Sequence, residues 1–141
     1  MIQHPGGIDA AGWGGLLSLG AKLRSVAGVI VDGPVRDIDD SRAIGFPVFA
    51  RGVTPRTARG RIAEVAFNEP IAIGGVQVSS GDLAVADGSG VVFLAAGNVD
   101  RILEVAEMLA TRERAMTTAL LEGTTVSQVM GADYEQSLET R

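Results

Sequence analysis

Arg36 and Asp37 are the two residues of this chain whose types and placement best suit catalysis. They stand in the stretch VIVDGPVRDIDD, residues 29–40, after an apolar run over residues 26–31. The Gly33-Pro34 dipeptide predicts a turn where a buried strand stops, which would leave both charged groups at its exit. An arginine can bind a carboxylate through its planar fork, and an aspartate can hold a hard cation such as Mg²⁺. Alternatively, the two residues form only a local ion pair or a helix N-cap.

A second candidate stretch is rich in glycine. Gly12, Gly14 and Gly15 surround Trp13 at the start of a helix that apolar residues at helical spacing predict over residues 10–24. Glycine weakens a helix, so several at its N-terminus suggest backbone N–H groups kept open for a ligand. A Gly-rich turn that merely lets the helix pack closely would have the same sequence.

The composition argues against several classes of site. The chain has 141 residues, 46% of them hydrophobic and 4% aromatic, so an aliphatic globular core is expected. A net charge of −5 without a basic run argues against a nucleic-acid partner, and no apolar stretch is long enough to span a membrane. The chain has no cysteine, which fits a cytoplasmic protein. His4 and Lys22 are the only residues of their types, so a Ser-His-Asp triad or a Schiff-base lysine has little support.

The rest of the chain predicts an α/β fold with a mixed sheet and flanking helices. Residues 1–9 form a Gly/Pro-rich lead-in and residues 124–141 a tail, so one domain would cover residues 1–141. Turn residues at Gly74-Gly75 and Asp87-Gly88 predict two hairpins. The expected strands are 26–31, 46–50, 60–67, 71–73, 76–78, 83–86 and 91–94, and the expected helices are 10–24, 37–44, 98–121 (ended by Gly123) and a turn or two around 126–130.

Three stretches resemble the RraA-like family, named for the regulator of ribonuclease activity A. The family also contains divalent-metal-dependent 4-hydroxy-4-methyl-2-oxoglutarate and 4-carboxy-4-hydroxy-2-oxoadipate aldolases. The matching stretches are residues 11–37, 45–55 and 70–92, in the family's order and spacing. The resemblance implies a fold of the phosphohistidine-swivelling kind. It also implies a homo-oligomer, a trimer or a dimer of trimers, with the site between neighbouring subunits.

The resemblance also implies roles for individual residues. Arg36 would bind the carboxylate of a pyruvyl group, and Asp37 would ligate Mg²⁺ or Mn²⁺. A metal ion at the pyruvyl oxygen would stabilise the negative charge that builds there without a lysine imine. Glu113, on the last long helix, would reach a neighbouring subunit's metal site. The backbone amides that would cradle the substrate are those around Gly14, Gly15, Leu16 and Leu17.

The chain departs from the family pattern in two ways. Family members carry a longer segment before this glycine-rich stretch, so strands of the fold are expected to be missing at the N-terminus. An uncovered sheet edge favours pairing with another chain. We therefore expect obligate oligomerisation, either of this chain alone or with a different subunit that supplies those strands. The second departure is Gly15, where many members have glutamate, and it removes one acid near the substrate.

Two function classes remain open. One is a divalent-metal-dependent lyase acting on a small 2-oxo acid, by retro-aldol cleavage of a 4-hydroxy-2-oxo-dicarboxylate or by oxaloacetate decarboxylation, with release of pyruvate. The other is a non-catalytic regulator, or a subunit of a hetero-oligomer, that acts through protein contacts. Arg36 and Asp37 favour the first class, whereas the short N-terminus and Gly15 favour the second.

Overall fold

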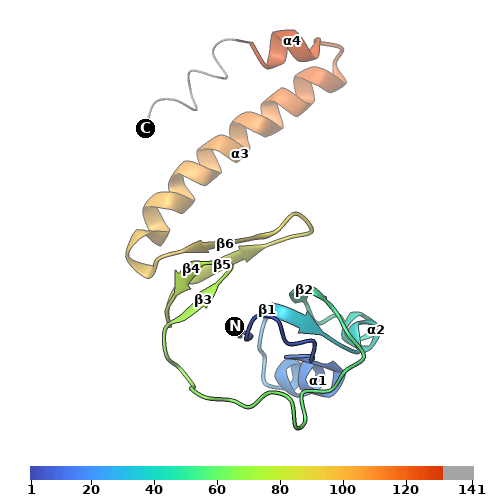
Figure 1. Cartoon of the computed structure of the whole chain (residues 1–141). Coiled ribbons are helices and arrows are strands. Elements are labelled where there is room, and N and C mark those ends of the chain that lie inside the picture. The colour runs from blue at the N-terminus through green and yellow to red at the C-terminus, as the bar shows by residue number, and fades with distance from the viewer. Residues whose placement is uncertain (132–141) are drawn as a thin grey trace. The chain divides into compact units, whose positions relative to one another are not determined.

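The computed structural model describes residues 1–131, which fall into two compact units (Figure 1). Unit 1 is Met1–Ala96 and contains the strands, and unit 2 begins at Gly97. The single domain expected from the sequence stays a prediction. Within the part of the chain that the structure describes, no helix is long and apolar enough to cross a membrane.

Unit 1 is built on a parallel strand pair. β1 (Val29–Val35) lies beside β2 (Val48–Val53), with Val29 opposite Val48. The short helix α2 (Ile38–Ala43) lies in the crossover that parallel strands require. Alternate residues of β1 point inward. The buried core cluster consists of Val29, Val31, Val35 and Phe46.

The predicted end of the first strand is wrong, because β1 continues through the Gly33-Pro34 dipeptide to Val35. A Cβ atom on Gly33 would lie 2.4 Å from Cγ of the buried His4 ring, so glycine leaves room for the imidazole. The register with β2 shifts between Val31 and Pro34, where proline has no N–H to donate. Arg36 therefore follows a strand end directly, without an intervening turn.

Helix α1 (Gly15–Leu23) begins later than predicted. The residues before it are held beside the end of β1 by backbone hydrogen bonds. The Gly12 N–H donates to the Pro34 carbonyl (2.9 Å), and the Arg36 N–H donates to the Trp13 carbonyl (3.0 Å). Because these groups are bonded to the strand, the segment cannot also form a helical turn.

The two predicted hairpins are confirmed to the residue. β3 (Ile71–Ile73) pairs with β4 (Val76–Val78), and β5 (Leu83–Ala86) pairs with β6 (Val91–Leu94), both antiparallel. The expected α/β class is confirmed, since helices accompany parallel and antiparallel strands. The single mixed sheet is wrong, because the described strands form three separate two-stranded sheets.

Side chains, rather than a backbone ladder, link the first hairpin to β1. The Asp32 carboxylate accepts the Gly74 N–H (2.9 Å) and forms an ion pair with Arg51 of β2. The Gln3 side-chain oxygen accepts the Ala72 N–H (2.9 Å). Since side chains take these N–H groups, β3 does not extend the β1–β2 sheet.

The strand predicted over residues 60–67 is wrong. The N–H groups of Arg61 and Ile62 both donate to the Ala58 carbonyl, which closes a local turn instead of pairing with another strand. Val65 is 97% exposed and Phe67 85%, so the alternating pattern does not mark a buried face here. A segment of alternating apolar and polar residues forms a strand only where a partner strand is available for pairing.

Unit 2 agrees with the prediction. The 3-10 turn η1 (Ala96–Asn98) leads into α3 (Val99–Leu121), and Gly123 follows with φ of 98°, a conformation typical of the residue after a helix. The short helix α4 (Val126–Val129) begins with a capping box. Residues 132–141 of the predicted tail lie outside the described residues.

The bond between Asp32 and Gly74 makes stability depend on pH. The Gly74 N–H, with a smaller contribution from Arg51, holds the pKa of Asp32 below its usual value, against the opposing effect of burial. A carboxyl group with a depressed folded-state pKa stabilises the fold above its unfolded-state pKa of about 4. That stabilisation is lost as the pH falls through the folded-state pKa.

Asp32→Asn should therefore lower the free energy of unfolding by about 1 kcal/mol at neutral pH and flatten its decline at acidic pH. Urea unfolding followed by Trp13 fluorescence at a series of pH values measures both effects. Asp39→Asn is the control, because Asp39 forms a solvent-exposed ion pair with Arg42 that contributes little. An Asp32→Asn variant as stable as this control at every pH would contradict the prediction.

Candidate functional site

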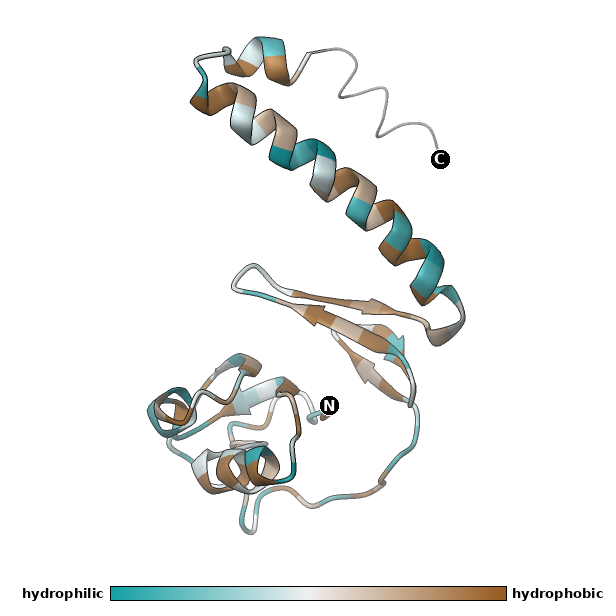
Figure 2. Ribbon diagram, turned by 180° about the vertical axis from the view of Figure 1, so that it is seen from behind, coloured by the Kyte–Doolittle hydropathy of each residue, from teal (hydrophilic) through white to brown (hydrophobic). Residues whose placement is uncertain are grey.

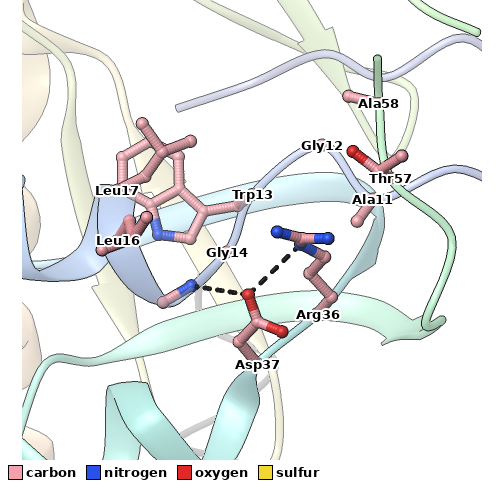
Figure 3. Close-up of a pocket in the computed structure, with 11 residues that line it drawn as sticks. Ala11, Gly12, Trp13, Gly14, Leu16, Leu17, Arg36, Asp37, Thr57 and Ala58 are labelled. Atoms are coloured by element: carbon pink, nitrogen blue, oxygen red, sulfur yellow. Dashed lines mark hydrogen bonds and ion pairs between the residues drawn. The ribbon is translucent and has the colours of Figure 1, made fainter. Parts of the chain in front are cut away.

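Arg36 and Asp37 lie in a cavity of about 170 Å³ in unit 1 (Figure 3). Its walls come from the segment before α1, the first turn of α1, the residues after β1, and the loop after β2. The cavity therefore joins segments that are far apart in the sequence. The lining residues are 11–17, Arg36, Asp37, Thr57 and Ala58.

One carboxylate oxygen of Asp37 takes part in an ion pair and in a hydrogen bond. Arg36 Nε lies 3.2 Å from Asp37 Oδ2, and the Gly15 N–H donates to the same oxygen at 3.3 Å (Figure 3). The side chains remain 40% and 37% exposed, so both are accessible to a ligand. Within residues 1–131, Asp37 Oδ1 and the two terminal nitrogens of Arg36 have no hydrogen bond or ion pair. The pair thus keeps one oxygen and one guanidinium edge available.

The backbone of Asp37 directs its carboxylate toward α1. Asp37 has φ of 53° and ψ of 40°, a left-handed conformation that a non-glycine residue adopts at a cost in free energy. It is the N-cap residue of α2, yet its side chain does not cap that helix. Of the two structural alternatives, the structure thus shows the ion pair and no side-chain cap.

The first turn of α1 presents free N–H groups to the cavity. Ser18 is the first residue whose N–H donates within the helix, to the Gly14 carbonyl at 3.0 Å. The Gly15 N–H is taken by Asp37, whereas the N–H groups of Leu16 and Leu17 have no partner in the described chain. Such groups at a helix start favour an anion.

Gly14 and Gly15 also allow a close approach. A Cβ atom on Gly14 would lie 3.1 Å from Asp37 Oδ2 and 3.3 Å from Arg36 Nε. A Cβ atom on Gly15 would lie 3.0 Å from Asp40 Oδ2. Close packing and exposed N–H groups, which the sequence left as alternatives, therefore occur together.

A second cavity, of about 470 Å³, shares Arg36 and Asp37 with the first and is also lined by Asp39, Asp40 and Thr54. The Asp39 side chain pairs with Arg42, whereas the Asp40 carboxylate has no hydrogen bond or ion pair within residues 1–131. Sequence reasoning missed Asp40. Its spacing from Asp37 by three residues on a short helix was the available signal, because residues three apart lie on one side of a helix.

The donor set fits a hard cation that keeps most of its waters. Among residues 1–131, no three histidine or carboxylate side chains gather closely enough to hold a metal ion by themselves. Mg²⁺ needs only one or two protein carboxylates, and Asp37 offers a free oxygen. Glu113 is exposed on α3 in unit 2, and its assignment to a neighbour's metal site stays a prediction.

Comparison with known proteins shows that this chain matches a protein family. Residues 1–93 match the family described as RraA-like, Aldolase/RraA. An uncharacterized protein of Methanocaldococcus jannaschii is 36% identical over 133 residues, 94% of this chain and 63% of that protein. A protein of Halalkalibacterium halodurans named "Putative 4-hydroxy-4-methyl-2-oxoglutarate aldolase" is 38% identical over 104 residues, 71% of this chain and 47% of that protein.

A solved structure extends the likeness to the fold. It is that of a Streptomyces coelicolor protein described as an unusual member of the RNase ES inhibitor RraA protein family. The TM-score is 0.75 at 29% identity, over 83% of this chain and 60% of that one. This chain spans less than two thirds of the length of each of these three proteins.

The contact at Gly15 can be tested within one helix. Gly15→Ala forces the Asp40 and Asp37 side chains to move, whereas a Cβ on Gly20 of the same helix meets nothing within 4 Å. Gly20→Ala should raise the free energy of unfolding by up to about 1 kcal/mol. Gly15→Ala should lower it by about 1 kcal/mol, since crowding outweighs helix propensity. Thermal unfolding measures both, and equal stabilisation by the two variants would refute the close contact.

Proposed function

This chain belongs to the RraA-like, Aldolase/RraA family, and on that premise we propose that it is a divalent-metal-dependent lyase acting on a 2-oxo acid. The reaction is retro-aldol cleavage of a 4-hydroxy-2-oxo-dicarboxylate, oxaloacetate decarboxylation, or both, with release of pyruvate. The observation that carries the proposal is the Arg36–Asp37 pair, which faces the free N–H groups of α1.

Arg36 binds the carboxylate of the 2-oxo acid. Its Nε pairs with Asp37, and its guanidinium group lies in the cavity that Ala11 and Thr57 also line (Figure 3). An arginine can hold one carboxylate with Nε and a second with its terminal nitrogens, because its donors lie in one plane. The Leu16 and Leu17 N–H groups stabilise the remaining negative charge of the substrate.

Asp37 supplies the metal ligand. The Gly15 N–H and Arg36 fix its Oδ2, which leaves Oδ1 to bind the ion. A Mg²⁺ or Mn²⁺ ion bound there supplies stabilisation of the negative charge that develops on the pyruvyl oxygen. No lysine is needed for this chemistry, and Lys22 lies outside the cavity lining.

Asp40 is the base of the aldol reaction in this proposal. It lines the larger cavity, and its carboxylate has no hydrogen bond or ion pair among the described residues. Asp40 takes the proton of the 4-hydroxyl group as the bond between C3 and C4 breaks, and the bonding electrons pass to the pyruvate enolate. The same proton then returns to C3, which gives pyruvate and the second carbonyl product.

The neighbouring copies of a homo-oligomer, a trimer or a dimer of trimers, would complete the site. Apolar side chains exposed in unit 1 support this part of the proposal. Leu16 is 85% exposed, and the largely hydrophobic strands β5 and β6 (Figure 2) expose Val85 and Val92 by more than half. Glu113 would reach a neighbour's site in such an assembly. The phosphohistidine-swivelling fold type and the cytoplasmic location stay predictions.

A non-catalytic role is the second candidate. It is supported by the likeness to the Streptomyces coelicolor protein, whose description is that of a ribonuclease inhibitor family member. In that case the exposed leucines of α1 would bind another protein, and Arg36 and Asp37 would form only an ion pair. The two functions differ in whether the chain releases pyruvate.

A coupled pyruvate-release assay on oxaloacetate decides between them. With Mg²⁺ the chain should release pyruvate, and EDTA should abolish the activity. Asp37→Ala should lower the rate by roughly 10²–10³-fold because charge stabilisation is lost. Arg36→Lys should mainly raise KM, because the planar fork is lost. Pyruvate release that is absent or independent of metal would favour the regulatory role.

Asp40→Asn tests the base. Cleavage of 4-hydroxy-4-methyl-2-oxoglutarate requires removal of a hydroxyl proton, whereas loss of CO₂ from oxaloacetate does not. The variant should therefore lose about 10²-fold or more in aldol cleavage and much less in decarboxylation. Asp39→Asn removes the same charge one residue earlier and should leave both rates nearly unchanged. Equal loss of the two activities in Asp40→Asn would exclude the base role.

A further inference from the structure

Two buried serine hydroxyls connect α1 to α2. Ser18 of α1 is 0% exposed and Ser41 of α2 is 1% exposed, and their Oγ atoms lie 2.7 Å apart. The Trp13 indole N–H donates to Ser18 Oγ at 2.8 Å. Among the described residues, the Ser18–Ser41 hydrogen bond joins a side chain of α1 to a side chain of α2. We refer to Ser18 and Ser41 as the hydroxyl pair.

Each member of the hydroxyl pair also reaches the backbone of a residue at the candidate site. Ser18 Oγ lies 3.3 Å from the Gly14 carbonyl, and Ser41 Oγ lies 3.4 Å from the Asp37 carbonyl. Each serine has one hydroxyl proton. If Ser18 donates to Ser41, then Ser41 donates to Asp37, and if Ser41 donates to Ser18, then Ser18 donates to Gly14. The link between the helices therefore always ends at one of these two carbonyls.

Packing alone does not explain two hydroxyls at this place. An alanine pair would nearly fill the same space, and burying a hydroxyl group has a cost that a hydrogen bond must offset. Asp37, four residues before Ser41, holds a left-handed backbone that surrounding contacts must stabilise. When Ser18 donates to Ser41, the Ser41 hydroxyl supplies such a contact at Asp37, whose carboxylate accepts the Gly15 N–H.

We propose that the hydroxyl pair is a positioning element, which fixes the backbone of Asp37 relative to the start of α1 and so sets the direction of its carboxylate. The inference rests on the proposed function in so far as that carboxylate is a metal ligand. Groups that orient a ligating residue typically change metal affinity by about 10- to 100-fold when removed. Ser18 and Ser41 act through Asp37 and touch no substrate.

The test uses the full chain with Ser41→Ala, Ser18→Ala and the double variant. The first readout is the amide proton shift of Gly15 in a metal-free ¹H–¹⁵N spectrum, because that N–H donates to Asp37 Oδ2. Ser41→Ala should move this resonance toward the position of a solvent-exposed amide. The second readout is Mn²⁺ affinity by calorimetry, which should fall by about 10-fold or more in either single variant. The double variant should lose little beyond the singles, because the two hydroxyls form one unit.

Val78→Ala is the control for stability alone. Val78 is buried in β4, away from the cavity lining, so its truncation should lower the unfolding temperature and leave the Gly15 resonance and Mn²⁺ affinity unchanged. Ser41→Cys replaces the hydroxyl with a slightly larger thiol that still fills the site, and it is the variant to use if Ser41→Ala does not fold. Its weaker hydrogen bonding should give an intermediate Gly15 shift.

The outcomes separate the two proposals. An unchanged Gly15 resonance in every folded serine variant would overturn the positioning role. A wild-type chain that neither binds Mn²⁺ nor releases pyruvate would overturn the proposed function. In that case the Gly15 resonance still decides whether the hydroxyl pair positions Asp37.

Discussion

The candidate site depends on one hydrogen bond, from the Gly15 N–H to the carboxylate of Asp37. It joins the start of α1 to the residue between β1 and α2, and it requires Asp37 to hold a left-handed backbone. A side chain on Gly14 would crowd both charged groups, so the approach of α1 depends on glycine. The bond also engages Oδ2, so Oδ1 is the oxygen of Asp37 that remains free to bind a ligand.

The strand pair serves mainly to bring three distant segments to one place. The Ala11 N–H donates to the Arg56 carbonyl (2.9 Å), and the Thr54 N–H donates to the Val35 carbonyl (2.9 Å). These bonds place the segment before α1 and the loop after β2 on the residues that end β1. The cavity is therefore a product of backbone bonding around one strand end, which is where parallel strands commonly present functional groups.

Local signals in the sequence predicted local structure well. The first hairpin is right to the residue because Gly74 and Gly75 both need positive φ, here 61° and 84°. The end of β1 and the start of α1 were not predictable in this way. The two boundaries depend on the hydrogen bond from the Gly12 N–H to the Pro34 carbonyl and on the packing of His4 against Gly33. Both are contacts between residues far apart in the sequence. Arg36 and Asp37 were identifiable because charged residues after an apolar run are conspicuous. Asp40 is marked only by its spacing from Asp37, and Ser18 and Ser41 carry no signal of this kind.

The use of arginine at position 36 follows from the same geometry. Asp37 Oδ2 lies 3.2 Å from Nε, so in the proposed function the substrate carboxylate uses the terminal nitrogens of the same side chain. A guanidinium group has five N–H donors in a fixed plane, and it can bind two carboxylates on different edges at once. A lysine has a single ammonium nitrogen, so its pairing with Asp37 would compete directly with binding of a substrate. The proposed function therefore requires separate hydrogen-bond donors for Asp37 and for the substrate, which arginine supplies at position 36.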